Sequence, residues 1–200
     1  MDLYAWLEIV VRQIILYGLP VIISLTCITM IEARLLRHSP PHPFYAISWS
    51  GTWLPWITSI LFTRGVIFAI PQPLLPGVRP ALYRFLGHVL LSAAGFLLYS
   101  WSLNHQPPSG LPPLHHWWAK LFMFYNLCMV CMHLLPLPGQ WLGELLLASK
   151  FAAPLSILSD RRYTVGIYTL LAASPLVDLL LGEPVIYPIY AMLANTAEML

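Results

Sequence analysis

The sequence predicts an all-α fold, a polytopic transmembrane helix bundle of about five to six spans that forms a single integral membrane domain over residues 1–200. Hydrophobic residues make up 58% of the 200 residues and charged residues only 9%, whereas a soluble domain carries about 25% charged residues. A helix needs roughly 20 apolar residues to cross a bilayer, and several runs approach that length. The composition therefore excludes a water-soluble globule and a disordered chain.

The first apolar run covers residues 9–31 and is predicted to form the first span. The segment 38–43 that follows holds three prolines, which remove backbone donors and cannot continue a helix. Near residues 43–50 we expect a short strand or a re-entrant segment, because this stretch is short and aromatic. The second run, 52–70, contains Arg64, which should lie near a membrane surface or face a partner because a bare charge is costly at that depth.

The second half of the chain continues in the same way. Four further apolar runs predict helices: 81–101, 117–135, 141–158 and 163–181. The last apolar piece, 184–194, has 11 residues and is too short to cross, so we expect it to lie at the membrane surface or to re-enter.

Lys and Arg residues near the ends of the spans predict the orientation, because they collect on the cytoplasmic side. Arg34, Arg37, Arg79 and Arg84 place the connections around them on that side. The loop 102–116 lacks Lys and Arg and therefore falls outside, as does the N-terminus by alternation. We expect an integral, multi-pass protein of a bacterial inner membrane.

The orientation leaves one run undecided. Arg161 and Arg162 also favour the inside, which conflicts with a full crossing by residues 141–158. Whether this run spans the membrane or re-enters stays open.

One stretch carries a family resemblance. Residues 126–143 read NLCMVCMHLLPLPGQWLG. This segment resembles the site-2 protease family of intramembrane zinc metalloproteases, whose pattern there reads N-x6-N-L-L-P-x-P-P-x-D-G-G. The chain keeps the first Asn as Asn126, the Leu-Leu-Pro-x-Pro core and the final Gly as Gly143, and it has His133 in place of the second Asn.

Three shorter pieces follow the family's order. Residues 33–36, ARLL, resemble the tail of the motif H-E-x-x-H-A-x-x-A-R-L-L, whose match begins near Ser24. Residues 50–55, SGTWLP, and the prolines of 70–73 are similar to segments that lie between the two family motifs. The resemblance thus implies a site-2-protease-like core at 24–143, followed by C-terminal helices at 144–200.

In the same alignment, the chain lacks the residues that carry out the family's catalytic chemistry. Leu25 and Thr29 fall where the two zinc-binding histidines belong, Thr26 takes the place of the catalytic Glu, and Trp141 takes the place of the ligating Asp. A catalytic zinc needs three imidazole, thiolate or carboxylate donors, and its water needs a general base. We therefore expect no cofactor and lean against an enzymatic function.

Other residues offer weaker metal sites. His38 and His42 have the spacing of H-x-x-x-H, but the prolines between them oppose a helix, so a pair of loop histidines is the preferred interpretation. Cys128 and Cys131 share a helix face that could hold a soft metal, although small residues in helix packing explain them better.

Three further polar residues have ordinary interpretations as well. His88 and His133 lie in different spans and could serve as haem ligands, but polar contacts between helices explain them better. Asp178 is a candidate for proton or ion handling, and its neighbours instead place it near a membrane surface.

The resemblance implies a non-catalytic site-2-protease-like protein that binds or scaffolds transmembrane partners, as an accessory or regulatory subunit of a membrane complex. Its partners would be membrane lipids and other transmembrane proteins, and the net charge of +2 without a basic stripe excludes nucleic acid. Two alternatives remain, an active intramembrane zinc metalloprotease with ligands at other positions and a small transporter. The candidate partner groove consists of Asn126, His133, Pro136, Pro138 and Gly139.

Overall fold

The computed structural model describes residues 2–107, 110–149 and 157–199, and within these ranges the regular secondary structure is entirely helical. The all-α prediction is therefore confirmed for this part of the chain. In chain order the helices are α1 (Leu3–Leu35), the 3-10 turn η1 (Tyr45–Ile47), α2 (Ser50–Leu61), α3 (Val78–Leu103), α4 (Leu114–Met132), α5 (Trp141–Leu147), α7 (Arg161–Ala173), the π-helix η2 (Asp178–Ile186) and α8 (Tyr187–Met199).

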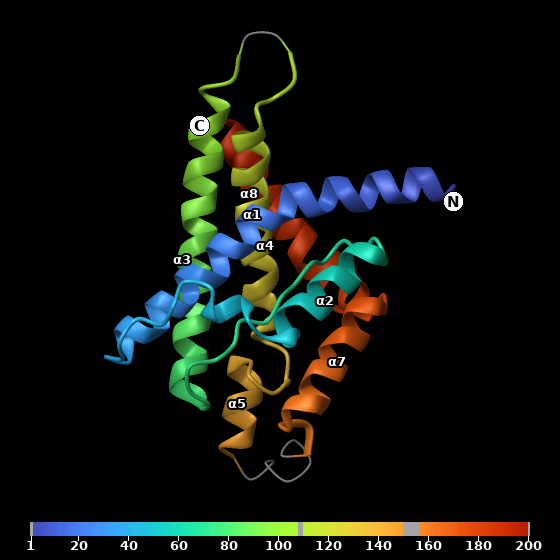
Figure 1. Ribbon diagram of the computed structural model, residues 1–200. Helices are drawn as coiled ribbons and strands as arrows, with labels where there is room; N and C mark the ends of the chain where they lie inside the picture. The colour runs from blue at the N-terminus through green and yellow to red at the C-terminus, as the bar shows by residue number, and fades with distance from the viewer. Residues whose placement is uncertain (1, 108–109, 150–156, 200) are drawn as a thin grey trace.

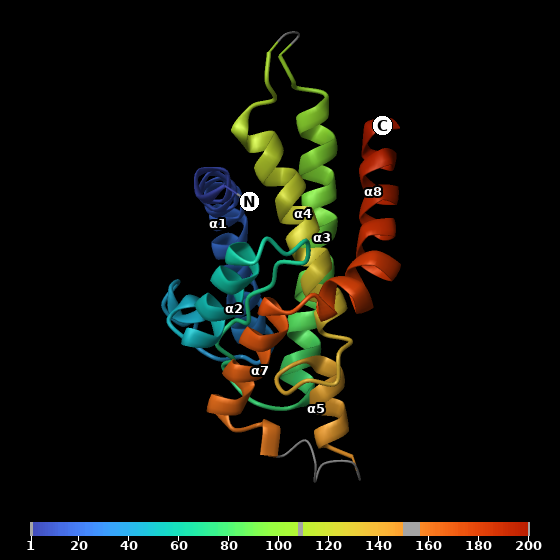
Figure 2. The same cartoon turned by 90° about the vertical axis from the view of Figure 1, so that its right-hand side faces the viewer.

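The helices α3 and α4 form an antiparallel pair at the centre of the molecule (Figure 1). Helix α1 runs across this pair, and Figure 2 shows its N-terminal part nearly end-on. Pro20 lies inside α1, where a proline removes a backbone hydrogen bond and bends the helix. Helices α2 and α7 pack against each other to one side of the α3–α4 pair, and α8 packs against α3.

Gly95 permits the close approach of α3 and α4. A Cβ atom at Gly95 would lie 2.7 Å from the Cα atom of Met123 on α4, a distance that real Cβ atoms do not adopt. Small residues at such crossings are a common feature of helix packing in membranes.

Two helices, α1 and α3, are long and apolar enough to cross a membrane. A third crossing is possible by the same criteria if residues 162–173 and 178–199, which are bent by 67° at their junction, form one broken span. The described residues therefore include helices that could cross a membrane, but the predicted number of five to six spans is not confirmed.

The run 52–70 does not form one span. Its helix, α2, has 12 residues and ends at Leu61. Thr63 then adopts a positive φ of 50°, which is incompatible with a continuing right-handed helix. After Arg64 and Gly65, residues 66–70 continue without regular secondary structure through the buried core.

Of the two alternatives expected near residues 43–50, a short strand or a re-entrant segment, the strand is wrong. This segment forms η1, and its backbone bonds are local, since Ile47 donates to the Phe44 carbonyl at 3.2 Å and Ser48 donates to the Tyr45 carbonyl at 3.2 Å. Groups engaged in such turns are not available for pairing with a strand. For the run 141–158, α5 ends at Leu147 and residues 150–156 lie outside the described residues, so its crossing remains undecided.

Side chains from three other elements hold the extended segment 66–70. Asp178 accepts the backbone N–H of Val66 at 2.7 Å, Tyr125 donates to the Ala69 carbonyl at 3.2 Å, and Thr52 donates to the Ile70 carbonyl at 2.7 Å. In a membrane interior such groups need partners inside the protein, because each unsatisfied group costs several kcal/mol. Asp178 therefore has a structural role in this arrangement.

Arg64 caps the C-terminal end of α7. Its guanidinium donates to the Ala173 carbonyl from Nε at 3.1 Å and from Nη2 at 2.5 Å. This carbonyl belongs to the last residue of α7, where the helix stops and its final acceptors lose their intrahelical donors. The charge that the sequence places in an apolar run thus faces a partner within the chain.

Candidate functional site

The positions aligned with the zinc ligands are occupied by side chains that contact their own chain. Leu25 is fully buried in the apolar core. The Thr26 hydroxyl donates to the Pro43 carbonyl at 3.2 Å, and the Thr29 hydroxyl donates to the Leu25 carbonyl at 3.0 Å. The ring of Trp141 stacks on Phe85 of α3, with their centroids 5.2 Å apart.

The weaker metal candidates do not converge either. His38 and His42 lie in an exposed loop, where Nδ1 of His42 accepts the backbone N–H of Phe44 at 3.2 Å. Cys128 and Cys131 are buried free thiols. Across the described ranges, no three or more His, Cys, Asp or Glu residues gather as metal ligands would.

Asn126 instead joins three helices through a buried polar chain. Its side-chain nitrogen donates to the Ser24 hydroxyl of α1 at 2.8 Å and to the Phe122 carbonyl at 2.8 Å. Its oxygen lies 2.8 Å from Nδ1 of His88 on α3. Because an amide oxygen can only accept a hydrogen bond, Nδ1 of His88 is the donor and carries a proton.

His133 begins a second set of contacts just after α4. Its Nδ1 accepts the backbone N–H of Trp141 at 3.3 Å, which anchors the start of α5. The ring centroids of His133 and His88 are 5.6 Å apart, so the two buried polar groups are neighbours. The Nε2 atoms of both rings are buried and have no hydrogen-bond partner among the described residues.

A buried ion pair lies beside these histidines. Arg84 of α3 and Glu32 of α1 are 3% and 1% exposed, and their charged atoms are 2.6 Å apart. Arg84 also donates to the Gly139 carbonyl at 3.2 Å. Arg84, one of the residues from which the orientation was predicted, thus has its counter-charge inside the protein, and the side of the membrane on which it lies stays a prediction.

Glu144 holds the loop between α4 and α5 in place through hydrogen bonds. Its two carboxylate oxygens accept the backbone N–H of Gly139 at 2.9 Å and that of Gly77 at 3.0 Å. Gly143, the last matched residue of the family pattern, packs directly against the Leu137 backbone, where a Cβ atom would overlap the carbonyl oxygen. The loop 133–143 is therefore folded tightly against the N-terminal end of α3.

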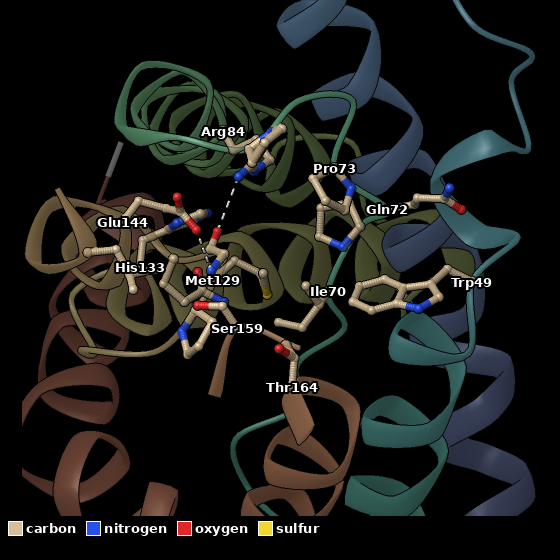
Figure 3. Close-up of a pocket in the computed structure, with 16 residues that line it drawn as sticks. Trp49, Ile70, Gln72, Pro73, Arg84, Met129, His133, Glu144, Ser159 and Thr164 are labelled. Atoms are coloured by element: carbon tan, nitrogen blue, oxygen red, sulfur yellow. Dashed lines mark hydrogen bonds between the residues drawn. The ribbon is translucent and has the colours of Figure 1, made fainter. Parts of the chain in front are cut away.

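These contacts surround a cavity of about 430 Å³ (Figure 3). Three of the five groove candidates, His133, Pro138 and Gly139, lie in its wall, whereas Asn126 and Pro136 do not. Figure 3 shows Arg84, Glu144 and His133 toward one side of the cavity, and Trp49 and Gln72 toward the opposite side. The remaining wall includes Pro71, Pro73 and Pro76 of the segment before α3.

Some residues of this site could be predicted from the sequence and others could not. The loop residues were recognisable from their Leu-Leu-Pro-x-Pro pattern, but the residues that hold the loop, Glu32, Arg84 and Glu144, were not predicted to belong to the site. The available signal is an acidic residue directly after one apolar run, Glu32, and a basic residue within another, Arg84, since charges beside or within apolar runs require partners. Comparison with family models, with curated proteins and with solved structures finds no match for this chain.

Proposed function

We propose that the chain is a non-catalytic, site-2-protease-like membrane protein that binds a transmembrane segment of another protein, as an accessory or regulatory subunit. The observation that carries the proposal is the cavity beside the loop 133–143. Its walls combine the loop of the resemblance with the prolines that precede α3. Leu25, Thr29 and Trp141 at the aligned ligand positions supply no metal ligand set, and Thr26 at the position of the catalytic Glu supplies no general base.

The size of the cavity constrains how a partner binds. One turn of a helix with its side chains occupies roughly 400 Å³, from a diameter of about 10 Å and a pitch of 5.4 Å. A cavity of about 430 Å³ therefore accepts one helical turn or a few side chains, but not a whole span. The partner helix would pack across the mouth of the cavity and insert side chains between the loop and the proline segment.

The membrane topology belongs to the same proposal. A multi-pass protein in a bacterial inner membrane with its N-terminus outside agrees with Arg34, Arg37 and Arg79, which are exposed and free to lie at the cytoplasmic surface. A count of five to six spans requires α4 to cross as well. Its 19 residues correspond to about 28 Å, close to the hydrocarbon thickness of about 30 Å.

Photo-crosslinking tests the partner site. A photoreactive amino acid replaces Leu147, which lies in the cavity wall, and in a matched control it replaces Leu145, which is 45% exposed on the same helix and lies outside the wall. We expect a specific crosslink to the membrane-spanning part of a single partner from position 147 and not from position 145. Equal crosslinking from both positions, or crosslinks to lipid alone, would reject the proposal.

A further inference from the structure

Two buried polar atoms in the wall of the cavity have no hydrogen-bond partner in the part of the chain that the structure describes. They are Nε2 of His133 and Oε1 of Gln140, two residues that are 2% and 1% exposed. Both belong to the loop 133–143. Buried polar atoms are normally hydrogen-bonded, so two such atoms in the wall of one cavity indicate where a ligand places its own polar group.

The Nε2 atom of His133 is a hydrogen-bond donor. Nδ1 of this ring accepts the backbone N–H of Trp141 at 3.3 Å, so the proton of the neutral imidazole is on Nε2. The ring of His88 is the nearest polar neighbour, with the centroids 5.6 Å apart, but no hydrogen bond joins the two rings. An Nε2 atom that carries its proton cannot ligate a metal ion. This atom is therefore suited to an oxygen acceptor.

The Oε1 atom of Gln140 is a hydrogen-bond acceptor, because an amide oxygen has no proton to donate. The hydroxyl of Tyr168 lies beside this amide, but it donates its proton to the Pro138 carbonyl at 2.8 Å and so cannot serve Oε1. The loop thus offers the cavity one donor, on His133, and one acceptor, on Gln140.

We propose that the transmembrane segment bound in this cavity is anchored by a carboxamide side chain, Gln or Asn, an inference that rests on the proposed function. The carboxamide oxygen accepts from Nε2 of His133, and its nitrogen donates to Oε1 of Gln140. Ser and Thr hydroxyls also combine a donor and an acceptor, but in a helix they bond to the carbonyl four residues earlier. A carboxamide has no such partner in its own helix and gains most from the site.

The charges in the cavity wall favour a neutral anchor. An ionised carboxylate would meet Oε1 of Gln140 and the carboxylate of Glu144 in the same wall. An ammonium group would meet the N–H of His133 and the guanidinium of Arg84, which already has its counter-charge in Glu32. Like charges brought together at an interface are strongly unfavourable. The wall therefore discriminates against both kinds of charged side chain.

Synthetic helices of Leu and Ala, long enough to cross a bilayer, test the choice of anchor through one central guest residue. The full chain, with a photoreactive amino acid at Leu147, is mixed with each peptide in lipid vesicles at high lipid dilution, and crosslinking is titrated. Met is the matched control for Gln, because it has a similar shape and no N–H or carbonyl group. We expect half-maximal crosslinking of the Gln peptide at about tenfold lower concentration than the Met peptide. The Lys peptide should bind no better than the Met peptide.

Two variants of the chain locate the preference. Gln140→Met removes the acceptor, and the Gln and Met peptides should then crosslink at concentrations within about twofold of each other. Gln72→Met is the control, since Gln72 lies in the same wall but its Oε1 already accepts the Ser48 hydroxyl at 3.0 Å. This variant should keep the preference for Gln. Crosslinking of the Met peptide at an unchanged concentration shows that each variant is folded at the cavity.

The outcomes separate this inference from the proposed function. Equal crosslinking of the Gln and Met peptides to the original chain, or a preference for Gln that persists in Gln140→Met, would overturn the inference. The binding of transmembrane segments would still stand in both cases, because the Met peptide is captured beside position 147. If no peptide crosslinks more from position 147 than from position 145, the proposed function fails and the inference fails with it.

Discussion

Glu32 of α1 and Arg84 of α3 form a buried ion pair whose charged atoms are 2.6 Å apart. The pair links two helices that are 52 residues apart in the chain, and Arg84 extends the link to the Gly139 carbonyl of the loop beside the cavity. The positions of α1, α3 and the candidate partner site are therefore coupled through a single guanidinium group.

Removing one member of this pair should destabilise the protein strongly. Arg84→Met leaves the Glu32 carboxylate buried without a counter-charge, and we expect the free energy of unfolding to fall by about 3–5 kcal/mol. The double variant Glu32→Leu/Arg84→Met removes both charges and should recover most of the loss. Denaturant unfolding in detergent measures the effect. The control Arg79→Met removes an exposed charge and should cost less than about 1 kcal/mol.

Asn126 should contribute to stability through the three-helix polar chain. Asn126→Leu removes the acceptor of His88 and the donor to Ser24, so at least one buried polar group loses its partner. We expect a loss of about 1–3 kcal/mol in the free energy of unfolding. Asn195→Ala, at an exposed position on α8, should change it by less than about 0.5 kcal/mol. Equal effects of the two substitutions would show that the chain from Ser24 to His88 does not stabilise the fold.

A comparison of two glycines tests the approach of α3 to α4. Gly95→Ala forces a methyl group against the backbone of Met123 and should lower the free energy of unfolding by about 1–3 kcal/mol. Gly18→Ala adds the same methyl group on α1, where nothing lies within 4 Å, and should raise stability by up to about 1 kcal/mol because alanine favours the helix. Thermal or denaturant unfolding of both variants measures these changes. An unchanged free energy of unfolding in Gly95→Ala would contradict the close crossing of α3 and α4.

Metal analysis separates the proposed function from the protease alternative. The aligned ligand positions hold Leu25, Thr29 and Trp141, so we expect purified protein to contain far less than one zinc per chain. The measurement is elemental analysis after dialysis in detergent. One tightly held zinc that disappears in the variants His38→Ala and His42→Ala would instead support an active metalloprotease with ligands at other positions.

The sequence was most informative where a property depends on composition or local pattern. The low content of charged residues and the long apolar runs predicted membrane-crossing helices, because burial in lipid requires apolar surfaces and internally bonded backbones. The pattern Leu-Leu-Pro-x-Pro marked the loop that lines the cavity. The run 52–70 was misjudged as one span, because hydropathy alone does not distinguish a membrane helix from a buried extended segment held by Thr52, Tyr125 and Asp178.

By itself, then, the sequence determined that this chain is helical and apolar enough to enter a membrane, since both follow from average residue properties. The tertiary structure alone decided which polar residues meet. It pairs Glu32 with Arg84, joins Ser24 to His88 through Asn126, and places Glu144 against Gly77. Such contacts connect residues that are far apart in the chain and depend on how α1 crosses α3 and α4, a geometry that no local pattern encodes.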